Sequence, residues 1–300
     1  MTISTTRALT ALTITLTLSS AAAPRASGQS TTTDNAVAKE TPGAAQSAAQ
    51  EEPDDAVLKP AEPDFTLIDL PTSLNLPKYK SAIRVTHRFR QEFGSSGFGA
   101  NFFGIDSGAQ IGLEYRFGII ARGEVGIQRT SERTIQFFAQ YGLTRQDKRM
   151  PFEIAAMASI DGTNNFRDSY TPALGVIVGR LIGAHAALYV EPIYVNNSNP
   201  LPKELVDHND TFMLGVGGRF RVLPTVYIVA EASPRLWGYK PGVNHGSLAI
   251  EKRVGGHVFQ LNFSDSLATT MGQLATANHQ APGPTSRNWY MGFNISRKFY

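Results

Sequence analysis

From about residue 81 onward, apolar and polar side chains alternate with a period of two in repeated segments. In residues 81–91, every second side chain is apolar or aromatic, and most of the intervening ones are cationic. A β-strand places alternate residues on opposite faces, whereas a helix would mix them. Segments of roughly ten residues are also long enough for a tilted strand to cross a bilayer. The two faces are Ile83, Val85, His87 and Phe89 on one side, and Arg84, Thr86, Arg88 and Arg90 on the other.

The same alternation continues through the chain and predicts an all-β protein. We expect a transmembrane, antiparallel, up-and-down β-barrel of about twelve strands, with apolar faces toward lipid and polar faces toward the lumen. The expected strands cover residues 81–91, 107–117, 122–130, 134–144, 152–161, 170–181, 186–195, 211–222, 225–234, 246–253, 257–264 and 288–299.

The lengths of the connections support the same fold independently. Outer-membrane barrels alternate short periplasmic turns with longer extracellular loops. Here the even-numbered strands precede short links, at 118–121, 182–185, 223–224 and 254–256. Odd-numbered strands precede long ones, with the tight link at 131–133 as the exception; the long links are 92–106, 162–169, 196–210, 235–245 and 265–287. This pattern predicts that the first strand begins, and the last strand ends, on the periplasmic side.

The last expected strand carries a candidate assembly signal. Phe293, Ile295 and Phe299 occupy alternate positions that lead to Tyr300, although Arg297 interrupts the apolar face. An aromatic residue at the end of such a strand resembles the signal by which outer-membrane barrels are recognised for assembly. We therefore expect the barrel-assembly machinery and outer-membrane lipid as partners.

The residues before the barrel divide into two expected segments. Residues 1–28 combine a basic start, a Leu/Ala/Thr run and a small-residue cleavage site, which indicates an exported protein with a cleaved signal peptide. Residues 29–64 contain few large apolar side chains, so we expect a disordered periplasmic spacer. The barrel domain is then expected at 65–300, where residues 65–79 form a lead-in that Pro71 and Pro77 keep from being a strand.

Composition narrows the range of functions. The formal charge is +3 and charged residues make up 18% of the chain, so no broad basic surface indicates nucleic-acid binding. The chain has no cysteine, which excludes disulfides, thiolate metal sites and cysteine nucleophiles. We expect no cofactor.

The polar faces of the strands carry interleaved charges of both signs. One interpretation is a network of ion pairs that fills the lumen. The other is a narrow channel whose arginines prefer small anionic solutes. The candidate lumen-lining residues are Arg84, Arg88, Arg90, Glu114, Arg116, Arg122, Glu124, Glu153, Glu191, Arg219, Arg221, Glu231, Glu251 and Arg253.

The sequence offers little evidence of chemistry. A lipid hydrolase would need a serine activated by a histidine, but the chain has no Gly-x-Ser-x-Gly motif. His87, on the expected lipid-facing side, is the candidate for such a histidine. Residues 207–210 (DHND) group oxygen and nitrogen ligands in a loop, yet their spacing matches no calcium-binding pattern. We expect neither catalysis nor a metal site.

Several stretches resemble a known family. They are THRF at 86–89, FGIDS at 103–107 followed by GLEY at 112–115, YVEP at 189–192, and EASPR at 231–235 with GGH at 255–257. With these residues the segment from about residue 65 to 300 resembles a bacterial family of membrane-bound β-barrel domains of uncharacterised function. The resemblance implies an outer-membrane location and carries no catalytic or binding residues.

The sequence thus favours an outer-membrane barrel acting as a narrow pore or a structural or surface component. An outer-membrane lipid-modifying hydrolase and a soluble periplasmic β-fold are the alternatives.

Overall fold

The computed structural model describes residues 61–95, 97–199, 209–238, 244–276 and 288–300. All of them belong to one compact unit that begins at Ala49. The expected signal peptide and nearly all of the expected spacer lie outside the described residues. Among the described residues, no helix combines the length and the apolar character needed to cross a bilayer.

Thirteen strands and three short helices make up the described chain. Twelve of the strands have bounds within three residues of those expected from the alternation, and β10 lies in a segment that was expected to be a loop. The strands are β1 (Ser81–Glu92), β2 (Ala109–Ile120), β3 (Gly123–Thr130), β4 (Ile135–Gly142), β5 (Glu153–Gly162), β6 (Asp168–Ile182), β7 (Ala186–Val195), β8 (Thr211–Leu223), β9 (Val226–Ser233), β10 (Arg235–Gly238), β11 (His245–Val254), β12 (His257–Ser264) and β13 (Tyr290–Phe299). The helices are η2 (Phe102–Ser107), α1 (Thr163–Phe166) and α2 (Met271–Thr276).

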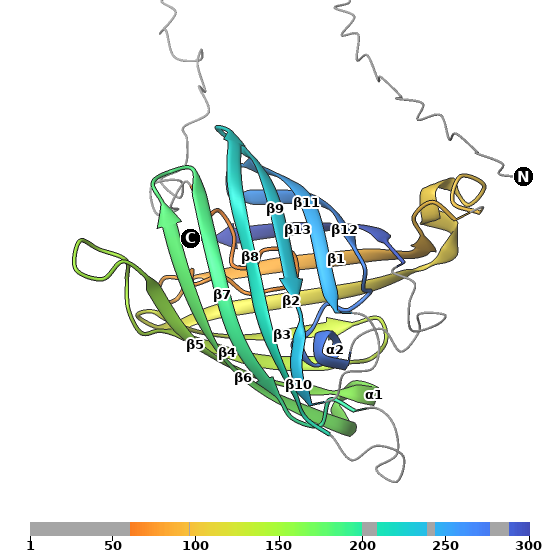
Figure 1. Cartoon of the computed structure of the whole chain (residues 1–300), viewed down its shortest axis with the longest axis horizontal. Coiled ribbons are helices and arrows are strands. Elements are labelled where there is room, and N and C mark those ends of the chain that lie inside the picture. Colours follow the sequence, from red (N-terminus) through yellow and green to blue (C-terminus); the bar gives the residue numbers. More distant parts are fainter. Residues whose placement is uncertain (1–60, 96, 200–208, 239–243, 277–287) are drawn as a thin grey trace, which may run out of the picture. The chain divides into compact units, whose positions relative to one another are not determined.

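The strands form a closed antiparallel barrel (Figure 1). Strands β1 to β9 each pair with their neighbours along the chain, β9 pairs with β11, and β11 to β13 follow in order. β13 then pairs with β1, which closes a ring of twelve strands. The short strand β10 pairs with β8 beyond the end of β9. The predicted twelve-stranded, up-and-down barrel is confirmed, and this is the architecture of bacterial outer-membrane barrels.

Burial follows the predicted alternation. In β1, Ile83 is 41% exposed while its neighbour Arg84 is 5% exposed. Many large apolar side chains of the other strands, such as Leu113, Leu174 and Ile250, also lie on the exposed outer face. A closed ring leaves no sheet edge, so every strand finds backbone partners without water, as a hydrocarbon environment requires.

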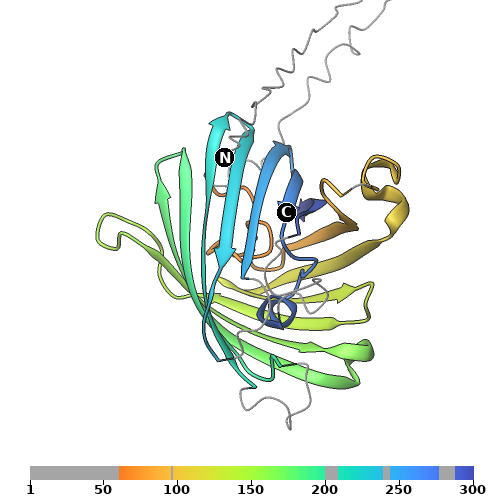
Figure 2. The same ribbon diagram turned by 45° about the vertical axis from the view of Figure 1, so that its right-hand side comes forward.

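The segment before β1 folds into the lumen. Residues 61–73 are all buried, and their backbone makes a small hairpin that the Thr66–Pro71 bridge closes. The amide of Leu67 donates to the carbonyl of Leu70, and the amide of Thr72 donates to the carbonyl of Phe65. We call residues 61–76 the luminal hairpin; it is orange in Figures 1 and 2.

The luminal hairpin corrects the expected domain boundary. The spacer was expected to continue to residue 64, but residues 61–64 are buried inside the barrel. They are held there because polar side chains of distant strands bind them: Ser296 donates to the carboxylate of Asp64, and Lys298 donates to the carbonyl of Pro63.

A second segment enters the lumen after β12. Residues 265–276 were expected to start an extracellular loop, yet most of them are buried, and we call them the inward loop. The inward loop includes α2, which packs against β5, β6, β7 and β8 from within the ring (Figure 2). Leu274 and Ala275 of α2 belong to the same buried apolar cluster as Leu67 and Leu70 of the luminal hairpin.

The wall of the barrel is adapted to these two segments. Between β5 and β11, many inward positions carry apolar side chains that join the same cluster, where a water-filled pore would expose them to water. These are Ala155, Met157, Ala173, Ile177, Ala187, Tyr189, Ile193, Val195, Met213, Tyr227, Val229 and Ala249.

Candidate functional site

The structure places ten of the fourteen candidate lumen residues in the buried interior. Each lies on a strand at a position whose side chain points inward, opposite the exposed apolar series. They are Arg84, Arg88, Glu114, Arg116, Glu124, Glu153, Glu191, Arg219, Glu231 and Glu251.

The other four candidates lie away from the buried interior. Arg90 is exposed near the end of β1, where it pairs with Glu132 at 2.6 Å. Arg122 lies in the turn between β2 and β3 with a positive φ of 67°. Arg221 and Arg253 are half-buried near the C-terminal ends of β8 and β11. The alternation alone did not distinguish them from the buried residues, because they lie near or beyond the ends of their strands.

One carboxylate binds the tip of the luminal hairpin. Glu231 of β9 accepts three backbone hydrogen bonds from consecutive amides of the hairpin turn. Its Oε2 accepts from Ile68 at 2.9 Å and from Leu70 at 3.2 Å, and its Oε1 accepts from Asp69 at 2.9 Å. Amides that a tight turn leaves without backbone partners form a ready anion site, so Glu231 both satisfies the turn and fixes its position.

The carbonyls of the same turn are bound from other strands. Arg219 donates to the carbonyl of Thr66 at 2.8 Å, and Gln260 donates to that of Leu67 at 2.7 Å. Asn294 donates to the carbonyl of Ile68 at 3.1 Å. These donors come from β8, β12 and β13, so the hairpin turn is bound from several sides of the ring at once.

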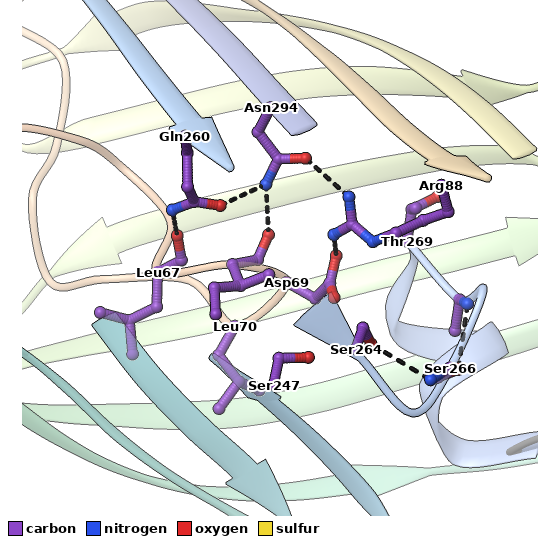
Figure 3. A network of polar contacts seen from close by, with 12 residues as sticks. Leu67, Asp69, Leu70, Arg88, Ser247, Gln260, Ser264, Ser266, Thr269 and Asn294 are labelled. Atoms are coloured by element: carbon purple, nitrogen blue, oxygen red, sulfur yellow. Dashed lines mark hydrogen bonds and ion pairs between the residues drawn. The ribbon is translucent and has the colours of Figure 1, made fainter. Parts of the chain in front are cut away.

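A chain of buried hydrogen bonds continues from the hairpin to the wall (Figure 3). Arg88 forms an ion pair with Asp69 at 2.8 Å, and both side chains are fully buried. The same guanidinium donates to Asn294 Oδ1 at 2.8 Å, and Asn294 donates to Gln260 Oε1 at 2.7 Å. Each member therefore has its orientation set by the next, which stabilises one arrangement of the network.

The base of the luminal hairpin is bound by the other half of the barrel. Glu124 accepts a hydrogen bond from the amide of Leu76 at 2.7 Å and pairs with Arg116 at 2.7 Å. Gln140 donates to the carbonyl of Thr72 at 2.9 Å. Glu62, near the start of the hairpin, accepts a hydrogen bond from Tyr189 at 2.6 Å.

Asp161 of β5 anchors the inward loop. Its carboxylate accepts hydrogen bonds from the hydroxyl of Thr270 and, at 3.0 Å, from the amide of Gly272. Gln136 orients the carboxylate by donating to its other oxygen at 2.8 Å. The aspartate thus binds the start of α2 at its unpaired amides, as an acidic residue does at a helix N-terminus.

Asp161→Ala is expected to release the inward loop and leave the barrel intact. Hydrogen bonds to a charged group contribute about 1.5–3 kcal/mol each, so amide exchange in residues 265–276 should accelerate by about tenfold or more. Hydrogen-exchange mass spectrometry would measure this. Asp168→Ala is the matched control because Asp168 contacts Asn164 in an exposed loop. Unchanged exchange in residues 265–276 would show that Asp161 does not hold the loop.

His245, which the sequence placed at the edge of a loop, lies in a cluster of acidic side chains. Its Nε2 is 2.9 Å from Glu231 Oε1 and 3.8 Å from Asp69 Oδ2. Its Nδ1 is 3.5 Å from Asp265 Oδ1. Sequence reasoning missed this cluster because the three carboxylates come from the luminal hairpin, from β9 and from the inward loop.

The same histidine also contacts a serine. Ser247 Oγ lies 3.3 Å from His245 Nε2, so Ser247, His245 and Asp265 have the order of a nucleophile, a base and an orienting acid. However, Glu231 lies closer to the same nitrogen. A nitrogen that donates to the Glu231 carboxylate cannot also accept the serine proton. All three side chains are buried as well.

His87, the other histidine that the sequence singled out, lies on the outer face. Its ring stacks on Phe293 with the centroids 4.7 Å apart and an interplanar angle of 9°. It also contacts Phe89. This makes His87 part of an aromatic group at the junction of β1 and β13, and Phe293 is one of the residues of the expected assembly signal.

Little space remains beside the two luminal segments. A cavity of about 40 Å³ lies between the luminal hairpin, β1 to β5 and the inward loop. Its lining includes Asp69, Arg84, Gln128 and Thr269. A buried water needs roughly 10–15 Å³ by this kind of measure, so the cavity has room for only a few water molecules. Among the described residues, this part of the lumen is therefore largely filled.

Comparisons with known proteins place the chain among membrane barrels. Among curated proteins, none matches it in sequence. An outer membrane channel from Pseudomonas putida F1 aligns with a TM-score of 0.47 and 9% identity, over 76% of this chain and 98% of that one. Outer membrane phospholipase A from Escherichia coli gives 0.41 and 10%, over 80% and 98%. Omp33 from Acinetobacter baumannii gives 0.38 and 9%, over 74% and 99%.

These structural likenesses are too distant to inform the function. The family comparison is more direct because it covers the barrel and part of the luminal hairpin. Residues 64–299 match the model of a family described as a membrane bound beta barrel domain (DUF5777), and the chain therefore belongs to this family of membrane-bound β-barrels.

Proposed function

We propose that the protein is a gated channel of the outer membrane and that this structure is its closed state. The observation that carries the proposal is the lumen itself, where the luminal hairpin and the inward loop lie inside the ring and leave a cavity of about 40 Å³ beside β1 to β5. A complete ring of twelve strands surrounds these segments without using them as strands. Opening then requires the luminal hairpin to leave its place inside the ring.

The way in which the hairpin is bound supports a removable plug. Its contacts with the wall are made by wall side chains such as Glu231, Gln260 and Gln140, whereas the wall strands pair with each other. Withdrawal of the hairpin therefore breaks no strand ladder. Water that enters the open lumen would hydrate the freed polar groups, which reduces the free-energy cost of opening.

The buried charges favour cations over the anions expected from the sequence. Among the candidate lumen-lining residues, arginines outnumber glutamates. The luminal hairpin and the inward loop add further carboxylates. Among the described residues, eleven acidic side chains are buried, against six basic ones and His245. The acidic ones are Glu62, Asp64, Asp69, Glu114, Glu124, Glu153, Asp161, Glu191, Glu231, Glu251 and Asp265; the basic ones are Arg84, Arg88, Arg116, Arg219, Arg235 and Lys298.

A disulfide between the hairpin and the wall tests the proposal. A β-carbon built on Gly179 of β6 would lie 2.5 Å from Oγ of Ser73 in the hairpin. Cysteines at these two positions therefore fall within the reach of a disulfide, whose β-carbons lie about 3.5–4.5 Å apart. The chain has no other cysteine. We expect oxidised Ser73→Cys/Gly179→Cys protein to show no channel openings in planar bilayers, and reduction with dithiothreitol to restore wild-type openings.

A second pair of cysteines, placed within the wall, controls for effects of a disulfide that do not involve the hairpin. Thr86→Cys/Gly112→Cys would join β1 to β2, since a β-carbon on Gly112 lies 2.5 Å from Thr86 Oγ1. Oxidation of this control is expected to leave the conductance unchanged. If the oxidised and reduced forms of the hairpin variant conduct equally, the hairpin is not the gate.

The alternative of a lipid-modifying hydrolase is not favoured. The contact between Ser247 and His245 is buried and is shared with Glu231. His87, which faces outward, stacks on Phe293 and has a tilted contact with Phe89. We therefore propose no catalytic role, and release of fatty acid from phospholipid by the purified barrel would contradict this.

A further inference from the structure

Three potential metal ligands meet at the tip of the luminal hairpin. Asp69 belongs to the hairpin, Glu231 to β9 and His245 to β11, and one ligand atom of each lies within 4.8 Å of the others. All three side chains are buried. The chain brings them together from positions far apart in the sequence, so no local motif marks the site.

The distances suit a small cation after a minor adjustment. The Nε2 of His245 is 2.9 Å from Glu231 Oε1 and 3.8 Å from Asp69 Oδ2. Ligand atoms bonded to Zn²⁺ at about 2.0–2.2 Å lie roughly 3–3.5 Å from one another. The two distances to His245 therefore lie within about 0.5 Å of this range, and the ligand atoms of Asp69 and Glu231 are no more than 4.8 Å apart.

One ligand atom lacks a hydrogen-bond partner in the structure. Asp69 Oδ1 pairs with Arg88, but Asp69 Oδ2 accepts no hydrogen bond among the described residues, although the side chain is fully buried. This free oxygen is directed toward His245. An unsatisfied charged oxygen is costly in a buried site, whereas a bound cation would satisfy it.

Each ligand also has an outer partner of the kind that metal sites use. Asp265 Oδ1 lies 3.5 Å from Nδ1 of His245, which leaves Nε2 for a metal. Arg88 holds the other oxygen of Asp69, and backbone amides of the hairpin hold Glu231. Such partners fix the tautomer and the orientation of metal ligands.

The local charge suits a cation. Asp69, Glu231 and Asp265 contribute three negative charges in direct contact with the neutral imidazole that a metal requires. Arg88 offsets one of them. Carboxylates thus lie near both nitrogens of the imidazole, which favours a bound cation. One imidazole and two carboxylates suit a first-row transition ion better than Ca²⁺ or Mg²⁺, which prefer oxygen ligands alone.

We propose that Asp69, Glu231 and His245 bind one divalent transition-metal ion such as Zn²⁺. Because Asp69 is on the hairpin and the other two ligands are on the wall, the ion joins the plug to the barrel. Its binding stabilises the closed lumen and its loss favours opening. The binding site follows from the geometry alone, and the effect on opening rests on the proposed channel function.

The test uses the full barrel, purified without a polyhistidine tag and stripped with a chelator. Titration calorimetry with Zn²⁺ alone is expected to show one ion per chain, and Co²⁺ to give visible absorption bands in the same stoichiometry. His245→Gln and Asp69→Asn are expected to lose this binding. Asp265→Asn, which alters only an outer partner, is expected to weaken it by about 10–100-fold.

His185→Gln is the control, because His185 is exposed in the turn between β6 and β7. It is expected to bind Zn²⁺ as the wild type does. The heat-induced shift in gel mobility shows that each variant forms the barrel, and Asp69→Asn changes the hairpin without changing the wall. The proposal is overturned if stripped wild type binds no stoichiometric Zn²⁺, or if folded His245→Gln binds it equally well.

Conductance separates this proposal from the channel proposal. The disulfide experiment is run in chelator, so it tests the gate without metal. If the protein binds Zn²⁺ stoichiometrically but the reduced hairpin variant shows no openings, the proposed metal site is supported and the proposed channel is rejected. Openings that Zn²⁺ suppresses in the wild type, but not in His245→Gln, would support both.

Discussion

Deletion of residues 61–76 is expected to convert a closed barrel into a conducting one. The luminal hairpin supplies most of the material that fills the lumen beside β1 to β5, and the ring of strands closes without it. Single-channel recording in planar bilayers should change from the intermittent openings of the gated wild type to discrete, long-lived openings. The effect should exceed that of any single substitution, because the deletion removes the whole obstruction.

The open variant is also expected to prefer cations. Without the hairpin, the described wall and inward loop keep eight buried acidic side chains and six basic ones. A lumen with excess negative charge concentrates cations, and the reversal potential across a KCl gradient would show the sign. Deletion of residues 45–60, an equally long stretch before the hairpin, is the control and should leave conductance unchanged. A silent barrel after removal of residues 61–76 would contradict the assignment of the hairpin as the gate.

Glu251→Gln is expected to destabilise the barrel far more than the loss of an exposed charge. Glu251 pairs with Arg219 at 2.9 Å, and neither side chain is exposed. Removal of one partner leaves the other charge buried without compensation, which typically costs about 3–5 kcal/mol. Urea unfolding in lipid vesicles, followed by tryptophan fluorescence, would measure the change in the free energy of unfolding.

An exposed ion pair provides the comparison. Arg90 and Glu132 are 2.6 Å apart, but their side chains are 36% and 37% exposed. Such pairs contribute about 0–1 kcal/mol, so Glu132→Gln should have little effect. If the two substitutions lower the free energy of unfolding equally, burial does not determine the strength of these pairs.

The barrel could be predicted from the sequence because most strands pair with strands that are close to them in the sequence. Each strand pairs with the next one along the chain, and its period of two is visible in a window of about ten residues. The predicted strand at 81–91 and the observed β1 differ by a single residue. Strand β10 was missed because it has only four residues, Arg235–Gly238, and lies in the segment 235–245 that was expected to be a loop.

The contents of the lumen could not be predicted in the same way. For residues 65–79 the sequence indicated that Pro71 and Pro77 disfavour a strand, but it did not indicate what these residues contact. Their partners are distant in sequence: the hydrogen bond from Ser296 to Asp64 spans 232 residues. One signal was available, since inward positions such as Ile177, Ile193 and Met213 are apolar, which suits packing against protein better than contact with water.

The luminal hairpin also touches both strands that meet when the ring closes. Arg84 and Arg88 of β1 bind it from one side of that seam, and Asn294 and Ser296 of β13 bind it from the other. A segment that binds both margins adds contacts across the seam to those of the β1–β13 ladder. Occupation of the interior therefore stabilises the closed cylinder at the place where its two ends join.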